Sequence, residues 1–557
     1  MEKPNKIERL KAELPPWQYR ERLERLDWQH PTEADRFYLK NFGIYNIKLR
    51  PEYWMLRLRF DGGRIDTERL AAVAAAAHRE SARILLTARA QIELHGLKPS
   101  RIYPVWRELE AAGLCGDQTL TDNFRAVVTD PLSDCAPDAV IDTFPLIDAI
   151  RNRFLRRPEW IGTLPRKFNT ALIGRTIPSF NPWGNDLLFA LAEREGIPGF
   201  NLYLGGKNSE TAKSAELFCP PESIPDLFDA VATAYRKHGP RGSRAKTRLF
   251  HLIEAIGMAR MRELIETEYG HSLLPAGELK MRSSIENRDL RLPIQRHGRH
   301  GEIGAEDLKR IVDEAREHNL TLRLTPHQEL WLFESEELKV KREELNNRHS
   351  QRSTLNAQFA SAGSVTACAG SRYCPLSLWD IKEDLDLLPM KRLRDLGVSL
   401  GFSGCLKGCG RHYHSDLGLI GLRTNLYAET ERAARVFLGA LQAPQAAPGR
   451  MLYYSVPLRM LEELIHTILD DFEASALPAF EAFSRTVLSR YSVEFLQLWY
   501  LLRQLYDLDE TWINLFLSVN EEKLLQQMEQ LENFPSHEEI YEITRELSHR
   551  LWDDTQT

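Results

Sequence analysis

Four cysteines stand in two close pairs in the second half of the chain and could hold a metal centre. Cys368 and Cys374 are separated by five residues, and Cys405 and Cys409 are separated by three. Thiolates grouped in this way are soft ligands that suit a tetrahedral zinc ion or an iron-sulfur cluster. Zinc pairs usually have two to four intervening residues, so the longer spacing favours a cluster. Zinc and unrelated buried thiols stay open as alternatives.

The two pairs lie in the segments TACAGSRYC and CLKGCGRHYHSDLGLIG, which resemble the signature of the siroheme-containing nitrite and sulfite reductases. The resemblance implies that the four thiolates hold a [4Fe-4S] cluster and that Cys409 also binds the siroheme iron. Lys407 and Arg411 are then expected to contact the cofactors. Leu406 and Lys407 stand where the family usually has Pro-Asn, so the usual hydrogen bonding beside the cluster is not expected here.

Three basic segments earlier in the chain resemble further motifs of the same family, in the family's order. They begin at Thr87 (TARAQ), Asp122 (DNFR) and Leu164 (LPRKFN), and Ala90 replaces the usual glutamine in the first. The resemblance places four of their side chains over the open face of the siroheme: Arg89, Arg125, Lys167 and Asn169. A small oxyanion must be held and protonated while it gains electrons, which requires cations and proton donors.

Asn169 bears on the choice of substrate. Sulfite-reducing members of the family typically have a second lysine at this position, whereas nitrite-reducing members have asparagine. Nitrite carries one negative charge and sulfite up to two, so a site with one fewer cation favours nitrite. Further cofactor contacts are expected, because siroheme carries many carboxylates that attract cations and bare amides. These second candidates are Gly205, Gly206, Lys207, Arg244, Lys246 and Arg248.

A strand, helix and strand pattern occurs twice, and the two copies are related by a shift of 238 residues. The shift places Gly63 on Gly301 and Thr87 on Thr325, with apolar positions between them in register. Ungapped agreement of these landmarks indicates a duplicated unit, with a cofactor between two similar halves. It also agrees with the resemblance, because the siroheme reductases are built from such a repeat.

The expected fold class is α+β, with duplicated ferredoxin-like units, two α/β cofactor-binding regions around a central siroheme, and a helical C-terminal extension. The resemblance covers about residues 45 to 485. The predicted regions are an N-terminal helical arm (1–45), a first repeat (46–115), a siroheme-binding region (116–280), a second repeat (281–349), a region for the cluster and siroheme (350–485), and the extension (486–557).

Composition describes an ordinary globular chain. Of 557 residues, 43% are hydrophobic and 27% charged, and the net charge of −6 gives no reason to expect nucleic acid or an anionic membrane as a partner. The charged start and the lack of long apolar runs predict a cytoplasmic protein without membrane spans. No dinucleotide-binding fingerprint follows a strand, so an external electron donor is expected, either ferredoxin or a flavoprotein.

The leading functional hypothesis is the six-electron reduction of nitrite to ammonia. Reduction of sulfite to sulfide is the alternative with the same chemistry. A relative from corrinoid biosynthesis would share the repeat and the cysteines but carry out a different reaction. A redox sensor or a structural zinc protein that uses the same thiolates is the non-catalytic alternative.

Overall fold

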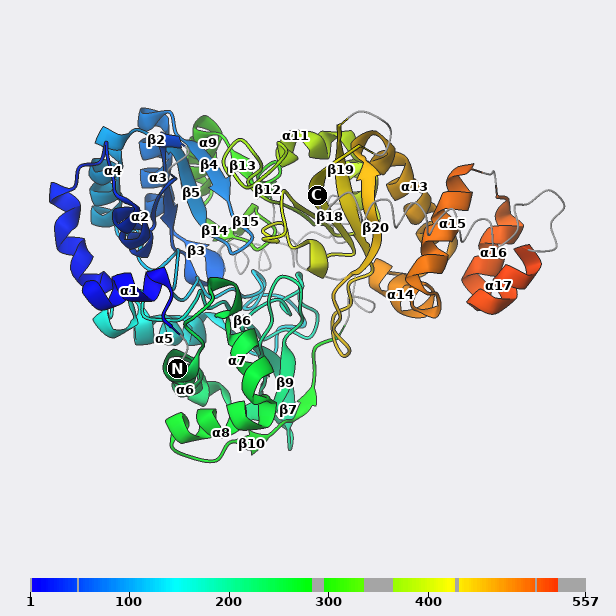
Figure 1. The fold of residues 1–557 in the computed structure, drawn as a ribbon, viewed down its shortest axis with the longest axis horizontal. Helices are drawn as coiled ribbons and strands as arrows, with labels where there is room; N and C mark the ends of the chain where they lie inside the picture. The colour runs from blue at the N-terminus through cyan, green and yellow to red at the C-terminus, as the bar shows by residue number, and fades with distance from the viewer. Residues whose placement is uncertain are drawn as a thin grey trace, which may run out of the picture. The chain divides into compact units, whose positions relative to one another are not determined.

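The computed structural model describes residues 3–47, 50–282, 295–334, 364–425, 430–505 and 508–528 (Figure 1). They divide into two compact units. The first holds residues up to 207, 211–281 and 295–334, and the second holds 208–210, 282 and the residues from 364 onward. Both combine helices with sheets that contain antiparallel pairs, which confirms the predicted α+β class. Among the described helices, none is long and apolar enough to cross a membrane.

The first unit begins with an arm that packs on a five-stranded sheet. The arm contains helices α1 (Lys6–Glu13) and α2 (Glu33–Leu39). The sheet has the order β1-β2-β5-β4-β13. Its strands are β1 (Ile44–Ile47), β2 (Arg50–Leu58), β5 (Ile92–Leu97), β4 (Arg83–Leu86) and β13 (Glu302–Ile303). Helices α3 (Thr67–Glu80) and α4 (Pro99–Ala111) share a buried apolar core with alternate residues of β2 and β5, including Leu56, Leu58, Ile92 and Leu94.

The second copy of the repeat forms a four-stranded sheet with the order β12-β15-β14-β3. Its elements are β12 (Gln295–His297), α9 (Ala305–Glu317), β14 (Leu320–Leu324) and β15 (Leu330–Glu334), with β3 (Arg64–Ile65) from the first copy. Helices α3 and α9 pack together, with Leu70 and Val73 of α3 in the same core as Leu308 and Ile311 of α9.

The two copies exchange short strands. In one sheet Ile303 of the second copy pairs with Ile84 of the first, and in the other Ile65 of the first copy pairs with Leu322 of the second. Ile65 and Ile303 are equivalent under the 238-residue shift, and so are Ile84 and Leu322. Equivalent residues of the two copies therefore form equivalent pairs, and each sheet is completed by a strand of the other copy.

The turn after the second strand of each copy is also duplicated bond for bond. The Thr87 hydroxyl accepts from the Gln91 amide at 3.1 Å, and the Thr325 hydroxyl accepts from the Glu329 amide at 3.3 Å. The third residue after the threonine has a left-handed backbone in each turn, with φ of 52° at Ala90 and 62° at Gln328. Gln328 therefore occupies in the second copy the backbone position that Ala90 occupies in the first.

The rest of the first unit is built on a third sheet with the order β10-β9-β8-β7-β11, where β6 pairs in parallel with β7. Its strands are β6 (Thr170–Ile173), β7 (Leu187–Arg194), β8 (Ile197–Leu204), β9 (Lys213–Cys219), β10 (Leu274–Pro275) and β11 (Glu278–Leu279). Its helices are α5 (Phe144–Phe154), α6 (Ile224–His238), α7 (Leu249–Ile256) and α8 (Met258–Tyr269). Residues of α5 to α8 share one apolar core with β6 to β9.

The second unit contains the four cysteines and a sheet with the order β16-β17-β18-β19-β20. Its strands are β16 (Val365–Ala367), β17 (Leu400–Ser403), β18 (Leu417–Thr424), β19 (Glu431–Leu438) and β20 (Arg450–Pro457). Its helices are α11 (Ile381–Asp384), α12 (Met390–Asp395), α13 (Leu458–Ala474), α14 (Phe480–Thr486), α15 (Val493–Leu505), α16 (Glu510–Ser518) and α17 (Glu521–Met528).

The predicted helical C-terminal extension begins with α15 to α17, while residues 529–557 lie outside the described residues. In Figure 1 the helices α15, α16 and α17 follow one another at the end of this unit. A buried polar contact joins the extension to α13, because Trp499 Nε1 donates to Asp471 Oδ2 at 2.7 Å. Trp499 also stacks on Phe516 of α16 at a ring separation of 4.5 Å. The extension therefore shares the core of the second unit.

Candidate active site

The predicted basic segments meet in the first unit. The Arg125 amide donates to the Phe168 carbonyl at 2.8 Å, and the Phe168 amide donates to the Asn123 carbonyl at 3.0 Å. These two bonds hold the segment 122–125 beside the segment 164–169. The motifs are 39 or more residues apart in the sequence, and buried Phe124 and Phe168 pack against each other beneath them.

Arg89 joins both segments from the duplicated turn. Its guanidinium donates to Asn185 Oδ1 at 2.8 Å, to the Ala126 carbonyl at 2.6 Å and to the Thr170 carbonyl at 3.1 Å. The turn, the 122–125 segment and the start of β6 are thus tied together by one side chain. The structure brings Arg89 and Arg125 into one group.

Arg125 is a buried cation without a carboxylate partner among the described residues. Its guanidinium donates only to the carbonyls of Asn123 and Thr121, at 3.4 and 3.1 Å. Burial, and then repulsion from Arg57, Arg89 and other nearby cations, lowers its pKa well below the usual range. An uncompensated buried charge costs several kcal/mol, on the order of the cost of a broken buried ion pair. A bound anion would remove that cost.

Two other buried polar groups also lack partners in the described part of the chain. The side-chain oxygen of Asn169 accepts no hydrogen bond, and neither amide atom of Gln91 is bonded. Both residues are less than a tenth exposed. Buried polar atoms are nearly always satisfied, so these atoms fit a bound polar group. Lys167 is half-buried two residues before Asn169.

Arg57 belongs to this cationic group and was missed by the sequence analysis. It lies on β2, where its guanidinium contacts Glu93 on the neighbouring strand β5. Of the charged residues that affect the pKa of Arg125, Arg57 lowers it most. The sequence of β2 contained a signal for Arg57. Leu56 and Leu58 on either side of it face the apolar core, so Arg57 lies on the other face of the sheet, where a charged residue indicates polar surroundings.

The buried carboxylate of Asp122 fixes the position of the segment that carries Arg125. Arg244 forms a bidentate pair with it at 2.7 and 2.8 Å, and Lys11 of the N-terminal arm contacts it at 2.8 Å. These cations hold the pKa of Asp122 below its usual range, although burial opposes this. Arg244 was predicted to contact a cofactor, and here its charge is neutralised by Asp122. The N-terminal arm therefore helps to hold the site.

A second buried carboxylate, Asp186, organises the glycine pair and Asn169. It accepts from the Asn169 amide at 2.8 Å and from two guanidinium nitrogens of Arg248 at 2.9 and 2.6 Å. Its carbonyl accepts from the amide of Gly205, whose φ is 82°. A Cβ on Gly206 would lie 2.2 Å from the Asn185 carbonyl oxygen, so only glycine fits there.

The other predicted cofactor contacts differ in their surroundings. The Lys207 ammonium lies 3.8 Å from the centre of the Phe250 ring, which is a cation–π contact. Lys246 is exposed. In the second unit Lys407 is exposed, and Arg411 has a left-handed backbone with φ of 57°. Burial lowers the pKa of Arg411 to about 10.

The cysteines follow the carboxyl ends of two parallel neighbouring strands. Cys368 comes directly after β16, and Cys405 comes two residues after β17. The Cys368 sulfur accepts from the amides of Gly370 at 3.3 Å and Gly404 at 3.2 Å. Burial raises the pKa of this thiol, and the nearby Cys374 adds to the shift while the two amides oppose it. Backbone amides directed at a buried sulfur suit a thiolate that binds a metal.

The glycines between the cysteines are required by close packing. A Cβ on Gly404 would lie 1.9 Å from the Ser377 hydroxyl and 3.2 Å from the Cys368 sulfur. Among the described residues, no three His, Cys, Asp or Glu side chains are gathered closely enough to hold a single metal ion. In a cubane cluster each thiolate binds a different iron atom, so its four cysteines need not form such a close group.

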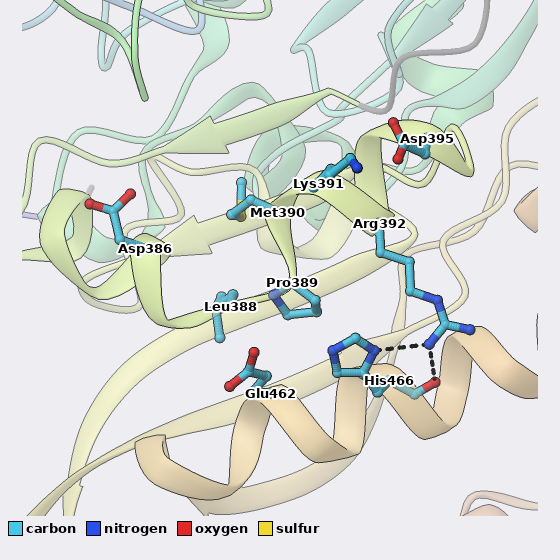
Figure 2. A pocket seen from close by; sticks show the side chains of 9 residues that line it. All are labelled: Asp386, Leu388, Pro389, Met390, Lys391, Arg392, Asp395, Glu462 and His466. Atoms are coloured by element: carbon cyan, nitrogen blue, oxygen red, sulfur yellow. Dashed lines mark hydrogen bonds between the residues drawn. The ribbon is translucent and has the colours of Figure 1, made fainter.

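A separate pocket of about 500 Å³ lies between α12 and α13 of the second unit (Figure 2). Arg392 extends along its wall and donates to His466 Nδ1 at 2.9 Å and to the His466 carbonyl at 3.3 Å. The same guanidinium is paired with Asp470 and Glu473. None of the predicted site residues lines this pocket, so it is distinct from the candidate active site.

Two family models match parts of the chain. Residues 47–112 match the nitrite/sulfite reductase ferredoxin-like half domain, and residues 120–273 match the nitrite and sulphite reductase 4Fe-4S domain. The second range contains Arg125, Lys167 and Asn169. The four cysteines lie outside both matched ranges, so their assignment depends on their own spacing and surroundings.

Similar proteins include both kinds of reductase. A ferredoxin–nitrite reductase of Leptolyngbya laminosa is 26% identical over 506 residues, covering 84% of this chain and 96% of the relative. A sulfite reductase [ferredoxin] 2 of Mycolicibacterium paratuberculosis is 26% identical over 430 residues, covering 71% and 75%. The structure of the Mycobacterium tuberculosis NirA protein superimposes with a TM-score of 0.75 at 23% identity, covering 89% of this chain and 98% of that one.

Proposed function

Because the chain belongs to the nitrite and sulfite reductase family, we propose that it catalyses the six-electron reduction of nitrite to ammonia. The cofactors are siroheme and a [4Fe-4S] cluster. The observation that carries the proposal is the buried Arg125 guanidinium, which has cations around it and, in the described part of the chain, no carboxylate bound to it. A small oxyanion is the ligand that such a group stabilises most.

The residues that would hold the cofactors fit them. Cys368, Cys374, Cys405 and Cys409 are the proposed cluster ligands, and Cys409 is the proposed sulfur shared with the siroheme iron. When bound, these groups supply an iron atom that takes the oxyanion and a route for the electrons. The unbonded buried atoms of Gln91 and Asn169 suit the polar edge of such a cofactor or its ligand.

The residues of the chain would bind the anion and supply protons. Carbonyl oxygens hold the guanidinium groups of Arg89 and Arg125 in place. Arg125 has no acidic partner among the described residues. Arginine stays protonated and is suited to holding oxygen atoms. Lys167 is the proposed proton donor, because its ammonium carries protons and it lies two residues before Asn169 in the same segment.

Asn169 supports nitrite over sulfite. Its side chain is neutral and buried, and its oxygen is unbonded within the described residues, so it adds a dipole but no positive charge. A singly charged anion needs less compensation than a doubly charged one. Reduction of sulfite to sulfide is the second candidate, because relatives of both kinds match at similar identity. The proposed electron donor is an external ferredoxin, the donor named for those relatives.

Visible spectra and steady-state kinetics test the proposal. Purified protein that contains siroheme and cluster should show a spectrum that changes on addition of nitrite, and kcat/KM with a chemical reductant should be higher for nitrite than for sulfite. Asn169→Lys should move that ratio toward sulfite. Lys309→Gln, which changes an exposed lysine on α9 outside the predicted site, serves as the control. A higher kcat/KM for sulfite in the natural sequence would contradict the nitrite assignment.

A further inference from the structure

A chain of hydrogen bonds runs along the polar face of β2 and β5 and ends at the cationic group. The Tyr53 hydroxyl is bonded to His95 Nδ1 at 2.9 Å, and His95 Nε2 is bonded to Glu93 Oε2 at 2.7 Å. The other oxygen of Glu93 accepts from Arg57. Tyr53 is half-buried, whereas Glu93 and His95 are 6% and 4% exposed. Glu93 is therefore a buried carboxylate held at both oxygens.

This carboxylate belongs electrostatically to the candidate active site. Arg57, its partner, shares a face of the chain with Arg59, two residues further on, whose guanidinium donates to the Phe124 carbonyl at 3.1 Å, directly before Arg125. After burial, the repulsion of Arg57 and then of Arg89 lowers the pKa of Arg125 most. Glu93 is bound to Arg57. The guanidinium of Arg57 and the imidazole of His95 hold the pKa of Glu93 at about 2 against the effect of burial, so the carboxylate is charged at neutral pH.

On the basis of the proposed function, we propose that Glu93 is a specificity-determining residue that lowers the positive charge of the arginine group and so favours a singly charged oxyanion. The effect follows from Coulomb's law, because a fixed negative charge repels a dianion twice as strongly as a monoanion at the same position. His95 and Tyr53 act as positioning residues. They hold the carboxylate on Arg57, where its charge acts on the anion without contacting it.

The contrast between two substitutions separates charge from shape. Glu93→Gln keeps the shape and removes the charge, whereas Glu93→Asp keeps the charge and shortens the side chain. Glu481→Gln is the matched control, because Glu481 is also buried and paired with an arginine, Arg485, but lies in the second unit. The measurements are dissociation constants for nitrite and sulfite from spectral titration, at a mildly alkaline pH at which sulfite carries two charges, and kcat/KM for both.

Glu93→Gln should raise the sulfite-to-nitrite affinity ratio by about tenfold, the size expected for one unit charge several ångströms away in a partly screened site. Glu93→Asp should leave the ratio near that of the natural protein while lowering kcat, because Arg57 is less well positioned. Glu481→Gln should change neither. An equal change for both anions in Glu93→Gln, or the same ratio change in Glu93→Asp, would overturn the proposal.

A second variant keeps the test decisive if Glu93→Gln does not fold. That variant is Glu93→Gln combined with Arg57→Gln, which removes both charges of the pair and is compared with Arg57→Gln alone. The double variant should have a sulfite-to-nitrite affinity ratio about tenfold higher than Arg57→Gln alone. The same ratio in both would contradict the proposed role of Glu93. The proposed function fails separately, if the natural protein with its cofactors reduces neither anion. In addition, anion binding can be followed by the shift in thermal unfolding midpoint, which does not depend on turnover.

Discussion

Replacing Asp186 by asparagine should destabilise the first unit strongly and disturb the site with it. The carboxylate is completely buried and its partner Arg248 has only 11% of its side chain exposed. An asparagine at position 186 can still accept a hydrogen bond from the backbone amide of Asn169. It leaves the Arg248 guanidinium as an uncompensated buried charge. Breaking a buried pair in this way costs about 3 to 5 kcal/mol. Asp186→Asn should lower the free energy of unfolding by that amount.

Urea unfolding of four variants, Asp186→Asn, Arg248→Met, their combination and Asp226→Asn, tests the reasoning. The double variant Asp186→Asn with Arg248→Met removes both charges and should recover a large part of the loss, because the penalty comes from the orphaned cation. Asp226→Asn breaks an exposed pair with Arg153 and should cost less than about 1 kcal/mol. A double variant as unstable as the sum of its single changes would refute the argument. So would an Asp186→Asn protein no less stable than Asp226→Asn.

Three further outcomes are expected. Gly206→Ala should cost about 2 kcal/mol or more in thermal unfolding, because the new Cβ would lie 2.2 Å from a carbonyl oxygen, whereas Gly449→Ala meets nothing closer than 3.6 Å and should be tolerated. Cys368→Ser should reduce iron and sulfide content, and Cys219→Ser, which changes a buried thiol elsewhere, should not. Burial raises the pKa of Asp471 from 3.8 to about 7, so the folded state binds more protons between these values and stability should fall as pH rises through that window. Asp471→Asn should remove this fall, about 4 kcal/mol, from the pH dependence of urea unfolding.

The fold could be predicted from sequence where the pattern is local. The strand, helix and strand pattern of the first copy predicted β2, α3 and β4, and the 238-residue shift indicated the duplication. The exchange of β3 and β13 could not be predicted, because two-residue strands carry no periodicity and their partners lie more than 200 residues away. Pairing at that distance is decided by the packing of α3 against α9.

Site residues that belong to sequence motifs could be predicted. The ion pairs that these residues form could not. Arg89 and Arg125 both belong to recognisable segments, and hydrogen bonds hold these segments together. Arg244 and Arg248 looked like further anion contacts, yet each is paired with a buried aspartate that sequence alone cannot assign to it. Arg57 was overlooked for the opposite reason, because a lone arginine in a strand usually marks a solvated face. The roles of the predicted site residues stay predictions until the variants are measured.

The exchanged strands make each half of the duplicated scaffold incomplete by itself. A polypeptide that ended before β13 would leave the outer backbone groups of β4 without hydrogen-bond partners, and one that began after β3 would do the same to β14. Two such fragments should recombine, each donating its short strand to the other, as in fragment complementation. A single copy expressed alone should by the same reasoning form a strand-swapped homodimer, in which the contact that is intramolecular here becomes intermolecular.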